Sequence, residues 1–254
     1  MGYPETLYHY TSINTLALIL SSRKIGFGRS DNANDKKEGS TGDSGSKEQY
    51  VFLSCWTENE EENLALWNLY TDRMRGVRIE LPMPIFPIHT NKKGDPIIIS
   101  HEDHIDCGRK IIISPYSGMV RKVEYTENIE LLEPQFVSKL DEEYEAFDFA
   151  KLGRYKRVIW SFEQEWRFIL SILPFDSNKK EQEMIDLMVE SVRKGIPPSV
   201  SQYLVEIDDE AFSKMKIRLG PRIQSGDFEI VKSLLNQYNP TAALETSSLE
   251  SDIR

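Results

Sequence analysis

Short strand-like runs, rather than long helices or a repeated strand–helix unit, most constrain the fold of this chain. Apolar or alternating runs of about four to eight residues predict strands. Such runs lie at 7–11, 50–56, 77–81, 96–100, 110–114, 119–125, 166–172, 203–207 and 216–219. They outnumber the predicted helices and do not alternate regularly with them. This pattern is typical of an α+β domain.

Helices are predicted where apolar residues recur at helical spacing. Ser12 is a candidate N-cap for a first helix, whose last turn is closed by the basic residues Arg23 and Lys24. Further helices are expected over 57–74, 138–152, 180–193 and 228–238. The segment 26–47 is polar and glycine-rich, so we expect a long mobile loop there. Loops of this length within a compact domain are usually functional or disordered.

Length and composition favour one globular domain without a membrane span. The 254 residues predict a single domain over 1–239 and a disordered tail, rich in Ser, Glu and Thr, over 240–254. Two cysteines are too few for a disulfide framework. No run of about 18 apolar residues is present, and the first residues lack the features of a secretory signal. We therefore expect a cytoplasmic protein with no membrane partner.

The acidic charge balance bears on possible partners. The chain carries 31 Lys and Arg against 41 Asp and Glu, a formal net charge of -10. It therefore gains no global electrostatic attraction to nucleic acid. A basic cluster at 151–157 is either a local nucleic-acid contact or, as we favour, a solvated face that balances the acidic run before it.

His9 is the first candidate for chemistry. In a strand, His9 and Thr11 face one way and Tyr8 and Tyr10 the other. The strand ends where a helix begins, and the free amides of a helix N-terminus favour anions. The alternative is an ordinary structural histidine.

The second candidate is the segment that contains Glu163, Glu165 and Arg167. If a strand begins at Glu163, these three side chains project from one face at alternate positions. Two carboxylates beside a guanidinium would then be held by rigid structure. The alternative is an edge-strand ion pair, which is common in proteins.

Two further groups have a structural and a functional interpretation. Trp67, Tyr70 and Met74 share a helical stripe, which either packs in the core or, if Leu66 and Leu69 fill the core, is free to stack on a planar ring. His101 and His104 are spaced unlike a metalloprotease motif, so we expect no metal site there. Neither a phosphate-binding glycine loop nor a nucleophile elbow is present.

In order along the chain, these signals resemble a widespread bacterial domain family that is related to the ADP-ribosyltransferase superfamily. The resemblance spans about residues 7–238 and depends on the order of its motifs. The motifs are Leu-Tyr-His-Tyr-Thr-Ser at 7–12, Asn34-Asp35 with Glu38, Phe-Leu-Ser-Cys-Trp at 52–56, Leu66-Trp67 with Tyr70 and Gly76, Glu163-x-Glu165-Trp-Arg167 and Leu-Gly-Pro-Arg at 219–222.

The resemblance implies a split antiparallel sheet that grips NAD in a cleft, with flanking helices and no required metal. It implies that His9, with Tyr10 and Thr11 beside it, holds the adenosine ribose. The stacking aromatic would be Tyr70 or Trp67. The resemblance also implies that Glu165 is the catalytic glutamate, with Glu163 two positions before it as in arginine-specific members. Arg167, two positions after Glu165, is a further candidate for binding NAD.

One motif departs from the histidine–tyrosine–glutamate type. Ser54 stands where that type has tyrosine, closer to the arginine–serine–glutamate type, so the acceptor is left open. Loop 26–47 would take the place of the loop over NAD, where Arg29, Asn34 and Asp35 could touch the dinucleotide.

The expected function is NAD-dependent transfer of ADP-ribose to a macromolecular acceptor, either nucleic acid or protein. By the same resemblance, such proteins act as toxins or phage-defence effectors, and an antitoxin protein is a possible partner. Two alternatives remain. One is an NAD glycohydrolase, in which water is the acceptor, and the other is a non-catalytic module that binds a nucleotide or a partner protein.

Overall fold

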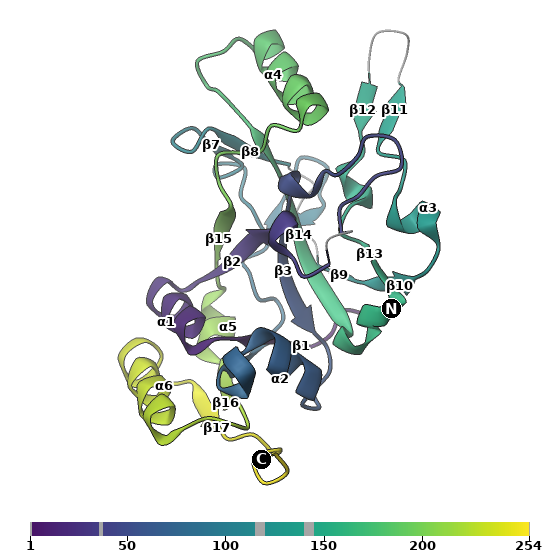
Figure 1. The fold of residues 1–254 in the computed structure, drawn as a ribbon. Coiled ribbons are helices and arrows are strands. Elements are labelled where there is room, and N and C mark those ends of the chain that lie inside the picture. Colours follow the sequence, from purple (N-terminus) through teal and green to yellow (C-terminus); the bar gives the residue numbers. More distant parts are fainter. Residues whose placement is uncertain (1, 36–37, 115–119, 140–144, 254) are drawn as a thin grey trace.

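In the computed structural model, a large, mostly antiparallel sheet forms the centre of a mixed α and β protein (Figure 1). The structure describes residues 2–35, 38–114, 120–139 and 145–253. The helices are α1 (Ile13–Ser22), α2 (Leu64–Tyr70), α3 (Ile129–Leu132), α4 (Glu181–Lys194), α5 (Asp209–Ser213) and α6 (Ser225–Tyr238). The α+β class predicted from the sequence is confirmed at this level.

Within the described residues, eleven strands join the main sheet. They are β1 (Thr6–Thr11), β2 (Lys24–Arg29), β3 (Val51–Thr57), β4 (Val77–Pro82), β7 (Ile105–Asp106), β8 (Ile111–Ile113), β9 (Val120–Lys122), β14 (Glu165–Pro174), β15 (Gln202–Glu206), β16 (Lys216–Leu219) and β17 (Ala243–Glu245). Three small pairs lie outside it: β5 (His89–Thr90) with β6 (Pro96–Ile97), β10 (Glu124–Thr126) with β13 (Tyr155–Arg157), and β11 (Val137–Lys139) with β12 (Glu145–Phe147).

The sheet separates between β1 and β3. The strand β1 pairs with β4 along its whole length, from Thr6 opposite Pro82 to Thr11 opposite Val77. By contrast, β1 meets β3 at a single register pair, Tyr8 opposite Thr57. The order β17-β16-β4-β1 therefore forms one half, and β3 leads into β14, β2 and their neighbours in the other. The two halves diverge from this one point of contact.

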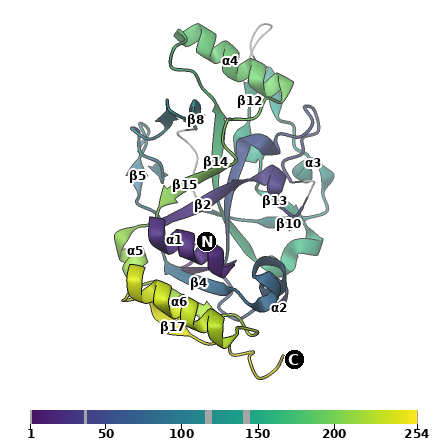
Figure 2. The ribbon, with the colours of Figure 1, turned by 60° about the vertical axis from the view of Figure 1, so that its left-hand side comes forward.

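The main core fills the space between the sheet and the helices around it. Its members come from both halves of the sheet and from α1, α5 and α6. Helix α1 begins at Ser12, whose hydroxyl caps the amide of Thr15 as predicted, and it buries Leu16 and Leu20. Both ribbon views place α1 beside α6 (Figure 2). The α1 side of the molecule is therefore anchored by the C-terminal helix.

Several segments differ from the sequence-based expectation. The start of the predicted loop 26–47 is part of β2, because Ile25 and Phe27 are buried at alternate positions despite Gly26 between them and Gly28 after them. Basic residues do not end α1 in its last turn, since Arg23 is its left-handed C-cap and Lys24 opens β2. The predicted helix 138–152 is also wrong, because β11, β12 and a short 3-10 turn occupy its described part, while 140–144 lie outside it.

Two more differences lie near the cleft and at the C-terminus. The helix predicted over 57–74 is only α2, which Asn63 caps through the amides of Ala65 and Leu66. The tail predicted to be disordered instead contributes β17, which pairs in parallel with β16. Strands predicted at 7–11, 77–81, 166–172 and 216–219 are confirmed within one or two residues, as is the helix over 180–193.

Candidate active site

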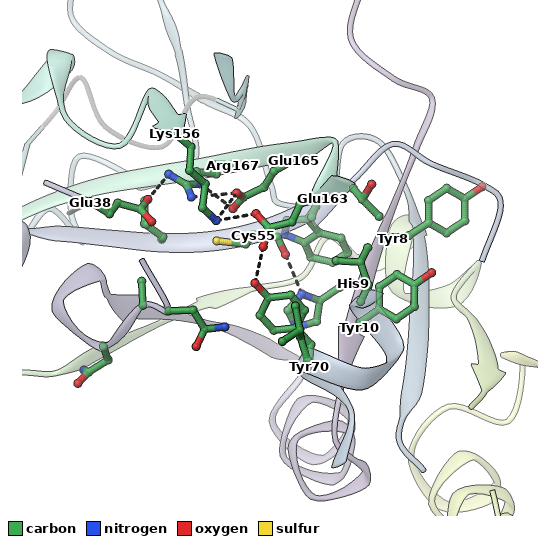
Figure 3. Close-up of a pocket in the computed structure, with 18 residues that line it drawn as sticks. Tyr8, His9, Tyr10, Glu38, Cys55, Tyr70, Lys156, Glu163, Glu165 and Arg167 are labelled. Carbon is green, nitrogen blue, oxygen red and sulfur yellow. Dashed lines mark hydrogen bonds and ion pairs between the residues drawn. The ribbon is translucent and has the colours of Figure 1, made fainter. Parts of the chain in front are cut away.

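A cleft of about 420 Å³ opens where β1 and β3 separate. Its walls come from β1, β3, α2, β13, Glu163 and the start of β14, together with residues 32–34 and Glu38 (Figure 3). The volume is within the range of about 300 to 1,000 Å³ that is typical of small-molecule sites. His9, from the start of the chain, and Glu165, from its second half, line this same cleft.

Glu163 and Glu165 both line the cleft, but the backbone that carries them differs from the predicted one. The strand begins at Glu165 and not at Glu163, which ends a 3-10 turn over Val158–Glu163. Gln164 lies between them in the left-handed conformation, with φ at 44°. The resulting bend keeps both carboxylates on the cleft side, together with Arg167. The convergence of the three side chains was predicted, but its basis in a continuous strand was wrong.

Arg167 holds Glu165 in a bidentate ion pair. Its Nε lies 2.6 Å from Oε1 of Glu165 and its Nη2 lies 2.9 Å from Oε2. Its Nη1 forms an ion pair with Glu38 and donates to the carbonyl of Gly153 at 3.1 Å. Arg167 is only 1% exposed, so its guanidinium contacts only partners within the protein and not solvent. Paired geometry of this kind fixes both orientation and charge.

Lys156 is the site residue that the sequence reasoning missed. Its Nζ lies 2.5 Å from Oε2 of Glu163 and 3.3 Å from Oε2 of Glu165, so it bridges the two carboxylates. In the sequence it belongs to the basic cluster that we interpreted as a solvated face. The other members fit that interpretation in part, since Lys151 and Arg154 are exposed and paired with Asp148 and Glu124. Lys156 itself is buried.

The two cleft glutamates differ in their acidity. Burial would raise the pKa of Glu165, but the charges of Arg167 and Lys156 outweigh it and bring that pKa to about 2. Burial and the adjacent charge of Glu165 raise the pKa of Glu163, against the opposing effect of Lys156. Burial likewise raises the pKa of Glu38. Neighbouring carboxylates with pKa values pushed apart are a feature of functional sites.

His9 presents one ring nitrogen to the cleft as an acceptor. Its Nδ1 lies 2.8 Å from the carbonyl oxygen of Cys55 on β3. A carbonyl oxygen can only accept, so Nδ1 carries the proton and Nε2 of the neutral ring keeps its lone pair. Enclosure in the cleft lowers the pKa of His9, which favours the neutral ring. The ring also packs against Trp56, with centroids 5.1 Å apart.

Helix α2 divides its side chains between core and cleft. Trp67 is fully buried and packs edge-on against Tyr10, with ring centroids 4.8 Å apart. Leu69 and Tyr70 face the cleft, and the hydroxyl of Tyr70 donates to Oε1 of Glu163 at 2.6 Å. Enclosure and the Glu163 charge raise the pKa of Tyr70, which keeps this donor protonated. The predicted aromatic stripe is therefore split, with Trp67 in the core and Tyr70 at the site.

The remaining predicted residues are partly in and partly out of the cleft. Tyr10 and Asn34 line it, whereas Thr11, Asp35, Ser54, Trp67 and Arg29 do not. Ser54 is buried and accepts from the indole of Trp56 at 2.9 Å. Asp35 forms an ion pair with Arg157 at 2.9 Å, and Arg29 one with Asp31 at 2.8 Å. These residues support the walls and do not face the cavity.

Groups of metal ligands and long apolar helices are both lacking in the described part of the chain. There, no three side chains of the His, Cys, Asp or Glu type are grouped so that they could hold a metal ion. His101 and His104 contact each other, with ring centroids 5.9 Å apart. In the same residues, no helix has the length and apolar character needed to cross a bilayer.

The chain was compared with known proteins in three ways. No family model matches it, and neither a curated protein nor a solved structure matches it. The geometry of the cleft is therefore the basis for a functional assignment.

Proposed function

We propose that this protein is an NAD-dependent ADP-ribosyltransferase that modifies a macromolecular acceptor. One observation carries the proposal: an imidazole from the first strand and a pair of glutamates from β14 and the turn before it line one cleft, where the sheet separates. That is the arrangement which the motif resemblance implies. The proposal would have failed if His9 and Glu165 lay on unrelated surfaces.

The residue types suit cleavage of the bond between nicotinamide and ribose. As this bond breaks, its electron pair stays on the nicotinamide nitrogen and positive charge develops at C1′ of the ribose, as in glycoside cleavage. A preorganised carboxylate stabilises that charge, an effect of roughly 3 to 4 kcal/mol per group. The acceptor's nucleophilic atom then bonds to C1′ and gives up its proton.

Other cleft residues have roles that fit the same substrate. The free Nε2 of His9 would accept a hydrogen bond from a ribose hydroxyl. The ring of Tyr70, at the cleft face of α2, would pack against the nicotinamide. The proposed reaction uses only the chain's own side chains and needs neither a metal nor a second cofactor.

The test is incubation of the purified protein with NAD labelled in its adenosine part, in the presence of cell lysate. We expect label on a macromolecule, and loss of that label under nuclease or protease identifies a nucleic-acid or protein acceptor. Release of free ADP-ribose without labelled macromolecule would indicate a glycohydrolase instead. If NAD stays intact with every lysate fraction, the enzymatic proposal is wrong.

A further inference from the structure

The two cleft glutamates are held in different ways, and this difference distinguishes their roles. Both oxygens of Glu165 are taken by the bidentate contact with Arg167, and one of them also by Lys156. Arg167 is itself held in place by Glu38 and by the carbonyl of Gly153. The charge of Glu165 is thus compensated and its hydrogen-bonding capacity is largely filled.

Glu163 has partners that it can exchange. Its Oε2 contacts Lys156, whereas among the described residues its Oε1 is held only by the hydroxyl of Tyr70, at 2.6 Å. Tyr70 is 36% exposed and lies on the cleft face of α2, so its side chain can yield to a ligand. Figure 3 shows the carboxylate of Glu163 directed at Tyr70, while Glu165 points to Arg167.

The Tyr70 hydroxyl marks where a substrate hydroxyl would bind. An O–H donor about 2.6 Å from a carboxylate oxygen is the short, charge-assisted geometry that a sugar hydroxyl makes with a glutamate. A ribose that displaced this hydroxyl would have its own hydroxyl on Oε1 of Glu163. Glu165 offers no comparable exchange, because the donors on its oxygens are buried cations.

We propose that Glu163, rather than Glu165, is the carboxylate that contacts the substrate ribose, and that Lys156, anchored by Glu165, positions it. This assignment rests on the function proposed above. Glu163 is then the catalytic residue, while Lys156 and Glu165 are positioning residues. In the transfer step the C1′–N bond breaks with its electrons on nicotinamide, the acceptor atom bonds to C1′, and the acceptor's proton passes to Glu163 and on to solvent.

The first test compares two amide variants of the cleft with a control outside it. We expect Glu163→Gln to lower kcat/KM for nicotinamide release on the order of 100-fold, measured on protein whose circular dichroism shows that the fold is retained. Glu165→Gln should lose about tenfold, because it acts only through Lys156. Glu124→Gln, which alters an exposed ion pair with Arg154, should match the wild type.

The outcomes separate the two proposals. If the wild-type protein does not cleave NAD, the proposed function is wrong. If the wild type cleaves NAD and folded Glu163→Gln stays within about tenfold of it, the assignment of Glu163 is overturned. Should Glu165→Gln fail to fold, the Glu163→Gln result and the pH profile of the Lys156 variants decide.

The pH profile tests the positioning role of Lys156. Glu163 contacts Tyr70 of α2 and Lys156 of β13, and it interacts with the charge of Glu165 and with Tyr125 of β10. Arg167, Glu38 and His9 line the same cleft. The charge of Lys156 and the hydrogen bond from Tyr70 oppose the rise of the Glu163 pKa. Removing the Lys156 charge raises that pKa further, so the activity of Lys156→Met should need a higher pH.

Lys156→Arg keeps the charge and should keep the acid limb of kcat/KM near that of the wild type. A purely structural lysine would lower activity at every pH without moving the limb. An identical acid limb in Lys156→Met and the wild type would therefore overturn the positioning role.

Discussion

At the scale of single residues, the protein buries a cluster of opposed charges. Glu38, Glu163 and Glu165 lie against Lys156 and Arg167, and each of these five side chains is almost fully buried. Buried ions are costly to desolvate, so they are tolerated only when each has close partners. Such a cluster contributes geometry to the cleft more than stability to the fold.

Removing Arg167 should therefore damage the fold as well as the site. We expect Arg167→Met to lower the free energy of unfolding by about 3 to 5 kcal/mol, because Glu38 is left buried without its cation and Glu165 keeps only the Lys156 contact at 3.3 Å. Urea denaturation measures this loss. Arg154→Met, which removes an exposed pair with Glu124, should cost at most about 1 kcal/mol. Equal stabilities of the two variants would contradict the prediction.

At the scale of elements, the turn between α2 and β4 is fitted tightly against the end of β16. A Cβ added at Gly220 would lie 2.3 Å from the carbonyl oxygen of Met74, and one at Gly76 would lie 2.2 Å from that of Thr11. Both contacts are with backbone, which cannot easily move aside. Because neither glycine has a Cβ, the turn after α2 can pack closely against the ends of β1 and β16. This packing fixes the position of Tyr70 at the end of α2.

A single methyl group should disturb this contact. We expect Gly220→Ala to destabilise the protein by about 1 to 3 kcal/mol through overpacking, measured by thermal or urea unfolding. Gly226→Ala is the matched control, because its Cβ meets nothing within 4 Å and alanine favours the helix by roughly 0.5 to 1 kcal/mol. Gly220→Ala with wild-type stability would show that the turn can shift.

Elements also show what the sequence could and could not predict. Strands that are short runs rich in apolar and aromatic residues, such as β1 and β14, were predictable from local pattern. The strand β2 was missed because Gly26 and Gly28 look like loop residues, although the ladder with β15 tolerates them. The β11–β12 pair was mistaken for a helix because acidic residues favour helices locally, whereas strand pairing is decided by tertiary contacts.

The sequence motifs predicted most of the cleft residues that matter for the proposal, but they did not predict the buried lysine that pairs with the two glutamates. His9, Tyr70, Glu163, Glu165 and Arg167 were identified from order and spacing, and all line the cleft. Lys156 was missed because three other bases surround it in the sequence. The available signal was strand alternation: in β13, Lys156 is buried between two partly exposed neighbours.

At the scale of the whole molecule, the C-terminal segment braces the helix that lines the cleft. Glu62, just before α2, accepts from Trp67 at 3.0 Å, from the hydroxyl of Ser247 at 2.5 Å and from the amide of Ser248 at 2.7 Å. Leu249 packs on the small core of Tyr10, Leu66 and Trp67. The last residues are therefore coupled to α2 although they are far from it in sequence.

Deleting 243–254 should loosen α2 while leaving most of the main sheet intact. It removes β17 and the serine partners of Glu62, so we expect faster hydrogen exchange of the amides over 64–70 and a lower melting temperature. Deletion of 251–254 alone keeps these contacts and should have little effect. Unchanged exchange in the longer deletion would show that α2 is held without the tail.

The separation of β1 from β3 also has a consequence for protein synthesis. One wall of the cleft is made within the first 60 residues, but the opposing carboxylates are at 163 and 165 and their strand ends at Pro174. Because chains emerge from the ribosome N-terminus first, a growing polypeptide holds an open, unfinished groove until β14 has been made. Whatever this groove binds, it becomes complete only after the residues up to Pro174 have been translated.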